Sequence, residues 1–268
     1  MKLEIRNFLN NILDLIYPIE CLGCKKEGEW LCEGCFKTIP INDSPYCLEC
    51  KIKTVYGEFC ERCKDKYNLN GVFIASDYDN ELIQKLIKTL KYKFISDISK
   101  GLSKLLFLFI QEQIKSAFVP TASELRRDKE NQKGEWSESI GVNSNNILSS
   151  FSQNLIVPVP LHKKRQRWRG FNQAEVLAKN FVEHYSSMQL DEDSLQRTRH
   201  TKAQAKLYGA ARKQNLKNSF QWRNENLGGR NVIIIDDVTT TGATLEECAR
   251  VLKKAGAGEV WGLVVAKG

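Results

Sequence analysis

The chain has 268 residues, of which 42% are apolar, and this is enough for one sizeable hydrophobic core and a small additional module. Its formal net charge of +8 is compatible with a polyanionic partner or an anionic substrate, and equally with ordinary surface charge. We expect no membrane-spanning helix, because no apolar run approaches the roughly 18 residues that a span requires.

Residues 1–17 have the pattern of an amphipathic helix. The apolar side chains recur at helical spacing, at Ile5, Phe8, Leu9, Ile12, Leu13 and Ile16. Charged residues interrupt the segment and no small-residue cleavage site follows it, so we reject a secretory signal peptide. We therefore expect a cytoplasmic protein.

Eight of the nine cysteines lie between residues 21 and 63 and form four CxxC pairs. The pairs are Cys21 with Cys24, Cys32 with Cys35, Cys47 with Cys50, and Cys60 with Cys63. Without a secretory signal, metal binding is favoured over disulfides. Two CxxC turns complete a four-sulfur shell of the kind that holds structural zinc, so we predict two zinc ions in a module spanning residues 18–70.

The lengths of the loops indicate how the cysteines pair. Short loops favour Cys21, Cys24, Cys32 and Cys35 on one ion and the other four on the second, and an interleaved pairing is the alternative. A closed shell leaves no open coordination position, so zinc would fold the module and take no part in catalysis. Structural zinc is worth on the order of 10 kcal/mol in small peptides, which would replace the core that this segment lacks.

From residue 71 onward, predicted strands alternate with predicted helices. Strands are expected near residues 71–76, 155–160, 230–237 and 259–268. Helices are expected near residues 80–92, 97–118, 174–185 and 244–255. The alternation predicts a mostly parallel sheet covered by helices, in a domain spanning residues 71–268. Residues 119–153 are polar and aperiodic, which is typical of a flexible insertion. Cys248 lies on an apolar helical face and is expected in the core.

The stretch VIIIDDVTTTGAT places two acids at the end of a buried strand. Ligands of open α/β sheets bind beyond the carboxyl ends of the strands, so Asp236 and Asp237 are expected at a binding edge. The loop that follows consists of Thr239, Thr240, Thr241, Gly242, Ala243 and Thr244. Its hydroxyls, its glycine and the amides of a helix start form an anion cradle. Acids beside such a cradle suit a ligand with a sugar diol and a phosphate, and Mg²⁺ could share the site through ligand oxygens and water.

The stretch VIIIDDVTTTGATL resembles the phosphoribosyl-pyrophosphate (PRPP) motif of type I phosphoribosyltransferases. The segments NELIQKLIKTLKY, VPVPLHKKRQRWRGFNQAEVLA and LQRTRHTKAQAKL resemble the ComF family, which includes ComFC-type competence proteins and GntX-like proteins, and the CxxC-rich front end fits it too. The resemblance covers nearly the whole chain except residues 119–153. It implies a type I phosphoribosyltransferase-like α/β fold with a small N-terminal four-cysteine zinc module.

The resemblance also implies roles by position. Asp236 and Asp237 would bind the ribose hydroxyls of PRPP, and the loop from Thr239 to Thr244 would hold its 5-phosphate. The loop from Leu161 to Arg165 would lie near the pyrophosphate.

Two basic segments precede the PRPP motif in the chain. The first contains Lys163, Lys164, Arg165, Arg167, Trp168 and Arg169. The second is residues 197–206, with Arg197, Arg199 and Lys202. Cations there would stabilise the charge on departing pyrophosphate, and the second segment is our candidate for a lid that excludes water. The first segment also suits single-stranded DNA, with Trp168 stacked on a base. A solvated charged surface is the alternative for both.

Two hypotheses about function follow. The first is an enzyme that binds PRPP with Mg²⁺ and transfers phosphoribose to an unknown nitrogenous acceptor. The second is a non-catalytic competence factor that uses the same fold to bind single-stranded DNA and other competence proteins. The family resemblance implies the second role and the composition only permits it, and the two roles can coexist.

Overall fold

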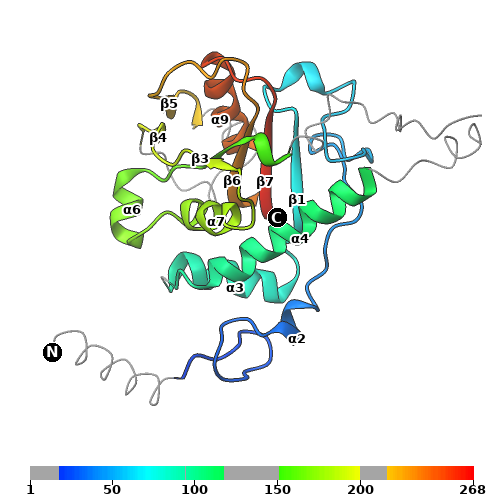
Figure 1. The fold of residues 1–268 in the computed structure, drawn as a ribbon, viewed down its shortest axis with the longest axis vertical. Coiled ribbons are helices and arrows are strands. Elements are labelled where there is room, and N and C mark those ends of the chain that lie inside the picture. Colours follow the sequence, from blue (N-terminus) through cyan, green and yellow to red (C-terminus); the bar gives the residue numbers. More distant parts are fainter. Residues whose placement is uncertain (1–17, 94, 118–150, 200–215) are drawn as a thin grey trace, which may run out of the picture.

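A parallel sheet forms the centre of the computed structural model, which describes residues 18–93, 95–117, 151–199 and 216–268 (Figure 1). The strands are β1 (Gly71–Asp77), β2 (Leu155–Pro158), β3 (Gln189–Leu190), β4 (Leu195–Arg197), β5 (Phe220–Trp222), β6 (Val232–Thr239) and β7 (Val260–Lys267). Five of them form one sheet in the order β1-β7-β6-β2-β3, in which every neighbouring pair is parallel. The predicted parallel sheet is confirmed, and β4 and β5 form a separate antiparallel pair.

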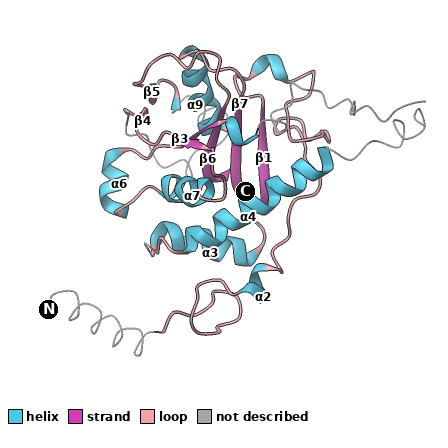
Figure 2. Cartoon of the chain, in the orientation of Figure 1, coloured by secondary structure: helices cyan, strands magenta, loops and turns pink. Residues whose placement is uncertain are grey.

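Helices cover both faces of the sheet (Figure 2). They are α2 (Glu33–Phe36), α3 (Glu81–Tyr92), α4 (Ile98–Ala117), α6 (Lys163–Arg169), α7 (Gln173–Val182) and α9 (Ala243–Lys254), with the 3-10 turns η1 (Lys64–Lys66) and η2 (Phe151–Gln153). Helices α4 and α7 pack on one face, with α3 beside α4, and α9 packs on β6 and β7. None of the helices in the described ranges has the length and apolar content needed to cross a membrane.

Strand β6 shows why apolar and polar residues do not alternate along the strands of this sheet. Val232 and Ile234 pack in one core cluster with the buried face of α9, while Ile233 and Ile235 pack in a second cluster with α4 and α7. All four side chains are fully buried. A parallel strand that is covered on both faces reads as a continuous apolar run, and the acids at its end are therefore the first polar side chains along it.

Helix α3 begins at a capping residue and buries one stripe. The side chain of Asn80 accepts a hydrogen bond from the backbone N–H of Ile83 at 3.0 Å, which satisfies an amide in the first turn. Ile83, Ile87 and Leu90 are fully buried on the predicted apolar face. Cys248 of α9 is also fully buried, which confirms its place in the core.

Two predictions about chain organisation need correction or cannot be followed. The predicted insertion extends to residue 153, but Phe151 is 2% exposed and meets Phe73 and Phe181 edge-on, each at a ring-centroid distance of 6.3 Å. The core therefore resumes before residue 153. The rest of the insertion and the amphipathic segment 1–17 lie outside the described residues.

The loop expected over residues 161–165 is wrong for its second half, because α6 begins at Lys163. The His162 side chain caps the helix by accepting the backbone N–H of Lys164 at 3.2 Å, and Gly170 ends it in the left-handed region with φ +81°. Lys, Arg and Gln are good helix formers, but they leave no apolar stripe. Apolar periodicity alone therefore gives no sign of this helix.

The connections of the sheet locate the ligand-binding edge. Strands β2 and β6 are neighbours, but the chain leaves β2 toward β3 at one end of the sheet and leaves β6 toward β7 in the opposite direction. Helix α7 follows β2 on one face, and α9 follows β6 on the other. Such a reversal opens a crevice beyond the carboxyl ends of the two strands, where ligands of open α/β sheets bind.

Candidate functional site

A cavity of about 290 Å³ lies at the carboxyl ends of β6 and β7. Its lining comprises Tyr78, Lys91, Asp236, Val238, Thr239, Thr240, Thr241, Gly242, Ala243, Thr244, Leu245 and Gly268. The six loop residues predicted to hold a phosphate are thus brought together around one cavity. A volume near the lower end of ligand pockets, roughly 300–1,000 Å³, suits a small phosphorylated sugar.

The loop between β6 and α9 turns at a glycine that no other residue can easily replace. Gly242 has φ +74°, in the left-handed region, and it is the N-cap of α9 without a side-chain cap. The first amides of any α-helix have no partner within the helix, and they carry the positive end of its dipole. The start of α9 therefore offers the wall of the cavity an environment that favours a phosphate.

The two predicted acids occupy different positions. Asp236 lines the cavity, and its Oδ1 accepts the backbone N–H of Asp237 at 2.9 Å. Asp237 is 2% exposed, and its Oδ2 lies 2.5 Å from the ammonium of Lys91. The structure therefore brings Asp236 and Lys91 to the cavity and places Asp237 behind them, in an ion pair with Lys91.

Burial shapes the ionisation of this pair of acids. Burial raises the pKa of Asp236 well above its usual range, and the adjacent Asp237 carboxylate raises it further, while Lys91 acts in the opposite direction. Burial also lowers the pKa of Lys91, but attraction to Asp237 and Asp236 outweighs burial and the pKa is raised. The site thus holds a charged lysine next to an acid that readily takes up a proton when no ligand is bound.

Lys91 is a site residue that the sequence analysis missed. It lies four positions after Ile87 and eight after Ile83, both fully buried, so it continues the apolar stripe of α3. A lysine on such a stripe points its charge toward the protein interior, where a buried charge requires a partner. This placement was the signal available in the sequence, and Asp237 is the partner.

One arginine from each predicted basic segment, Arg169 and Arg197, interacts electrostatically with the acids. Arg169 is 9% exposed, donates a hydrogen bond to Gln173, and has an Nε without a hydrogen-bond partner among the described residues. Burial lowers the pKa of both Arg169 and Arg197, Arg165 lowers each further, and Asp236 opposes the effect on both. Arg169 and Arg197 are therefore each close enough to Arg165 and to Asp236 to interact with them electrostatically.

The other predicted basic residues lie on the outer surface. Lys163, Lys164, Arg167 and Trp168 are exposed on α6, and Trp168 keeps 64% of its surface accessible. Arg199 is exposed and donates to the carbonyl of Lys217 at 3.0 Å. Lys202, with most of the predicted lid, lies outside the described residues. Helix α6 thus divides into an inward residue, Arg169, and an outward cationic face.

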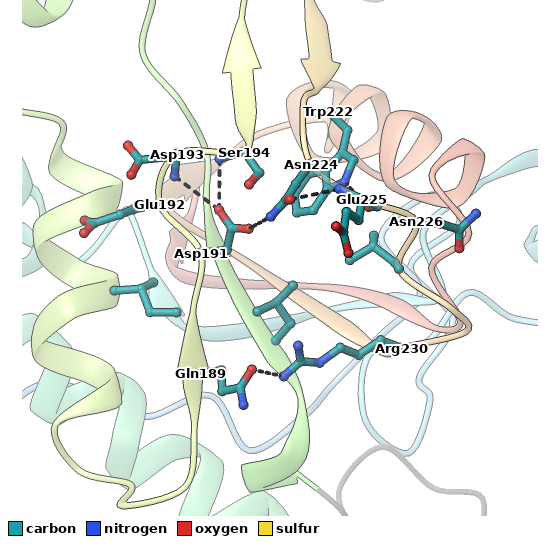
Figure 3. A pocket seen from close by; sticks show the side chains of 13 residues that line it. Gln189, Asp191, Glu192, Asp193, Ser194, Trp222, Asn224, Glu225, Asn226 and Arg230 are labelled. Atoms are coloured by element: carbon teal, nitrogen blue, oxygen red, sulfur yellow. Dashed lines mark hydrogen bonds between the residues drawn. The ribbon is translucent and has the colours of Figure 1, made fainter.

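A larger hollow of about 620 Å³ lies at the opposite edge of the sheet, near the amino ends of β2, β3 and β6 (Figure 3). Acids and amides line it, and the carboxylate of Asp191 accepts the backbone N–H groups of Asp193 and Ser194 (Figure 3). Arg230 lies there too, but its guanidinium donates to Gln189 at 2.6 Å. An acid-lined wall repels a polyphosphate, so the smaller cavity at the carboxyl edge is the better candidate site.

The cysteines form two separate four-sulfur clusters. The sulfurs of Cys21, Cys24, Cys32 and Cys35 lie within 4.8 Å of one another, and so do those of Cys47, Cys50, Cys60 and Cys63. This grouping confirms the sequential pairing and excludes the interleaved one. In a tetrahedral zinc site, Zn–S bonds of about 2.3 Å place the sulfurs about 3.8 Å apart. The separations of 3.6 Å between Cys24 and Cys32 and 3.5 Å between Cys50 and Cys60 fit that geometry.

Backbone amides prepare these clusters for a cation. Burial raises the pKa of the Cys21 thiol, but backbone hydrogen bonds, chiefly from Cys32, outweigh burial and lower the pKa to about 6. The same balance lowers the pKa of Cys47 to about 7. In the absence of a cation, neighbouring sulfurs and burial raise the pKa of Cys35 and of Cys63 to about 12. The closed four-sulfur geometry of each cluster is what fits a structural zinc ion, which binds the thiolate form.

Comparisons with known protein families divide the chain in the same way. Residues 12–64 match the double zinc ribbon domain, and residues 169–267 match the phosphoribosyl transferase domain. The first match contains all eight clustered cysteines. The second contains Arg169, Asp236 and the loop around the cavity.

Two relatives of similar length match nearly the whole chain, and a third matches part of it. Competence protein F of Haemophilus influenzae is 30% identical over 260 residues, covering 92% of this chain and 97% of that protein. DNA utilization protein YhgH of Escherichia coli is 30% identical over 255 residues, with the same two coverages. Competence protein ComFC of Bacillus subtilis is 35% identical over 104 residues, covering 38% of this chain and 39% of that protein. With its double zinc ribbon and its phosphoribosyl transferase domain, the chain belongs to the ComF family.

Proposed function

We propose that this protein binds PRPP in the cavity at the carboxyl ends of β6 and β7 and transfers phosphoribose to a nitrogenous acceptor. The observation that carries the proposal is the juxtaposition of Asp236 with the glycine-containing start of α9 around one cavity. The helix start suits the 5-phosphate, and the carboxylate suits the ribose hydroxyls. No other described cavity combines an acid with an anion-binding helix start at the switch point of the sheet.

The cations have a defined task in this reaction. The bond from C1 of the ribose to pyrophosphate breaks, a bond from the acceptor nitrogen to C1 forms, and the proton of the acceptor passes to water. Negative charge grows on the departing pyrophosphate, and cations near it stabilise the transition state more than the ground state. Arg169 and Arg197, which both interact with Asp236, are suited to this task, and the Nε of Arg169 has no hydrogen-bond partner among the described residues.

Magnesium would enter with the substrate. The pyrophosphate oxygens, the ribose hydroxyls and water would supply most of its ligands, with Asp236 close by, and the cation would neutralise part of the charge of PRPP. The chain itself has Lys91 next to both acids, which keeps the site near neutrality before the ligand arrives.

Isothermal titration with PRPP and Mg²⁺ tests the proposal. Asp236→Asn should weaken binding strongly because the neutral amide is a poorer acceptor for two hydroxyls. Asp193→Asn, an exposed acid of the hollow at the opposite edge, is the matched control and should bind like the wild type. Pyrophosphate release against a panel of nitrogenous bases then tests catalysis. Unchanged PRPP affinity in Asp236→Asn would refute the proposed site.

A second function is favoured by the outward face of α6. Lys163, Lys164 and Arg167 present three exposed cations beside the exposed ring of Trp168, a combination that suits phosphates and bases of single-stranded DNA. Two relatives carry names that refer to DNA utilization and to competence. We propose single-stranded DNA binding on this face as a function that accompanies PRPP binding, since the two surfaces use different residues.

A further inference from the structure

We propose that the second zinc ribbon, residues 47–63, is a built-in support of the phosphate loop, so that zinc binding at this ribbon and phosphate binding in the cavity reinforce each other. The first zinc ribbon, residues 21–35, has no such role and serves as an internal control. The inference deepens the proposed function, because it rests on loop 239–244 as the phosphate site.

The second ribbon contacts the phosphate loop at Gly242, the residue with a positive φ. Leu48, between the ligands Cys47 and Cys50, packs so closely on Gly242 that a Cβ on the glycine would lie 2.5 Å from Cδ2 of Leu48. Leu48 is 7% exposed. Gly242 holds a positive φ at the N-cap of α9 without a side-chain cap, so the leucine supplies the contact that limits this otherwise permissive backbone.

The segment that follows this ribbon is hydrogen-bonded to the next turn of α9. The carboxylate of Glu246 accepts the backbone N–H groups of Asn68 and Leu69 at 3.0 and 3.1 Å, and the Asn68 side-chain amide at 2.6 Å. These residues follow the last zinc ligand, Cys63, by only one turn of η1. Hydrogen bonds to a carboxylate are among the stronger ones in proteins, so they tie the start of α9 to the segment that directly follows the ribbon.

Packing makes the connection continuous. Cys47 and Cys63 are 0% and 4% exposed, and they belong to the same core cluster as Val72 of β1 and Ala243 and Leu245 of α9. Two zinc ligands are therefore part of the core on which the phosphate loop rests. Interiors packed at this density transmit displacement, so a ribbon that loses its zinc moves the loop.

The first ribbon makes an equivalent contact elsewhere. Leu31, beside the ligand Cys32, lies against Gly101 of α4, where an added Cβ would be 3.0 Å from Leu31 Cδ2. Glu33 pairs with Lys104 of the same helix at 2.8 Å. These contacts fix the first ribbon to α4. Each ribbon thus presses one leucine onto one glycine, and only the second of these glycines belongs to the candidate site.

The physical consequence is reciprocal coupling. The CxxC turn that carries Leu48 has its shape only while zinc joins Cys47 and Cys50 to Cys60 and Cys63, because metal binding and folding are linked in such modules. A phosphate that favours the supported form of the loop must then also favour zinc in the second site, by the same factor.

Leu48→Ala and Leu31→Ala, both loaded with two zinc ions, form the matched test. Leu48→Ala should weaken ribose 5-phosphate and PRPP binding about tenfold, within the usual range of coupling, and Leu31→Ala should leave both affinities within about twofold. Leu48→Met, which keeps the volume, should restore affinity. Saturating ribose 5-phosphate should slow chelator-driven zinc release from Cys35→Ser, which retains the second site, and not from Cys63→Ser, which retains the first.

Hydrogen exchange at residues 240–246 gives a readout that needs no ligand. Leu48→Ala should exchange these amides faster than Leu31→Ala does. If the wild type fails to bind PRPP but this difference is present, the proposed function falls and the support of the loop stands. If PRPP binds and the two alanine variants have equal affinities and equal exchange, the inference is overturned.

Discussion

The ammonium of Lys91 lies 2.5 Å from Oδ2 of Asp237, where the end of α3 meets the carboxyl end of β6. Two adjacent acids at a buried strand end would repel each other without a cation. Lys91 lies at the end of the apolar stripe of α3, lines the cavity and supplies that cation. The charge of the candidate site therefore depends on a residue of α3. Several consequences of this arrangement are open to measurement.

Replacement of Lys91 by methionine should destabilise the protein by about 3 kcal/mol, because it leaves the carboxylate of Asp237 buried without a partner. Chemical unfolding of the variant measures the loss. The double variant Lys91→Met/Asp237→Asn should recover most of it, since both partners are then neutral. A single variant as stable as the wild type would show that the ion pair contributes nothing to the fold.

Removal of the Asp236 charge should stabilise the protein while it damages the site. The folded-state pKa of Asp236 is raised, so the folded form binds a proton more tightly than the unfolded chain does, and the wild type loses stability as the pH rises above the unfolded value of about 3.9. Asp236→Asn has no such loss, so the difference in the free energy of unfolding between this variant and the wild type should increase with pH.

The free energies of unfolding of the wild type and Asp236→Asn at pH 5 and pH 8 test this sign. Zinc release at the lower pH affects both proteins and cancels in the difference. A variant that is less stable than the wild type at pH 8 would mean that the Asp236 carboxylate is stabilised by its surroundings, in contrast to the burial seen here.

Elemental analysis should find two zinc ions per chain. Cys35→Ser and Cys63→Ser should each retain one, because the two sulfur clusters share no residue. The free energy of zinc binding, on the order of 10 kcal/mol in small peptides, makes each loss visible as unfolding of one ribbon. One zinc in the wild type, or none in either variant, would contradict two independent sites.

Single-stranded DNA binding should depend on the outward face of α6. The triple variant Lys163→Ala/Lys164→Ala/Arg167→Ala removes three exposed cations. Each phosphate contact contributes roughly 0.7 to the slope of log K against log salt concentration, so the magnitude of that slope should decrease by about 2. A fluorescence anisotropy titration at several salt concentrations gives the slope.

A control for this prediction removes the same charge elsewhere. Lys85, Lys88 and Lys100 are exposed on or next to α3 and α4, and their replacement by alanine should leave the slope unchanged. Trp168→Ala should weaken binding about tenfold if a base stacks on the ring. Equal losses from both triple variants would indicate attraction by net charge alone.

The sequence was informative where its signals are local. The run that ends in Asp236 and Asp237 predicted both a buried strand and a ligand edge, and CxxC spacing predicted both zinc clusters. Helix α6 was missed because it has no apolar stripe: most of its charged residues are exposed, and its one buried residue, Arg169, is itself charged. In each case the prediction succeeded or failed according to whether a short stretch of sequence carries a pattern of its own.

Contacts between distant segments explain the remaining differences. Nothing near Asp237 indicates that Lys91 neutralises it, and nothing in the CxxC turn around Leu48 indicates that it rests on Gly242. Both contacts arise because the parallel sheet brings α3, the second ribbon and the end of β6 to one edge. A sequence pattern can place residues on a face, but the fold decides which faces meet.

A crystal structure of the protein soaked with PRPP and Mg²⁺ tests the central claim most directly. The predicted result is the 5-phosphate against the amides at the start of α9, the ribose hydroxyls on Asp236, and the pyrophosphate toward Arg169. An empty cavity with PRPP held on the outer face of α6, or no PRPP at all at saturating concentration, would contradict it.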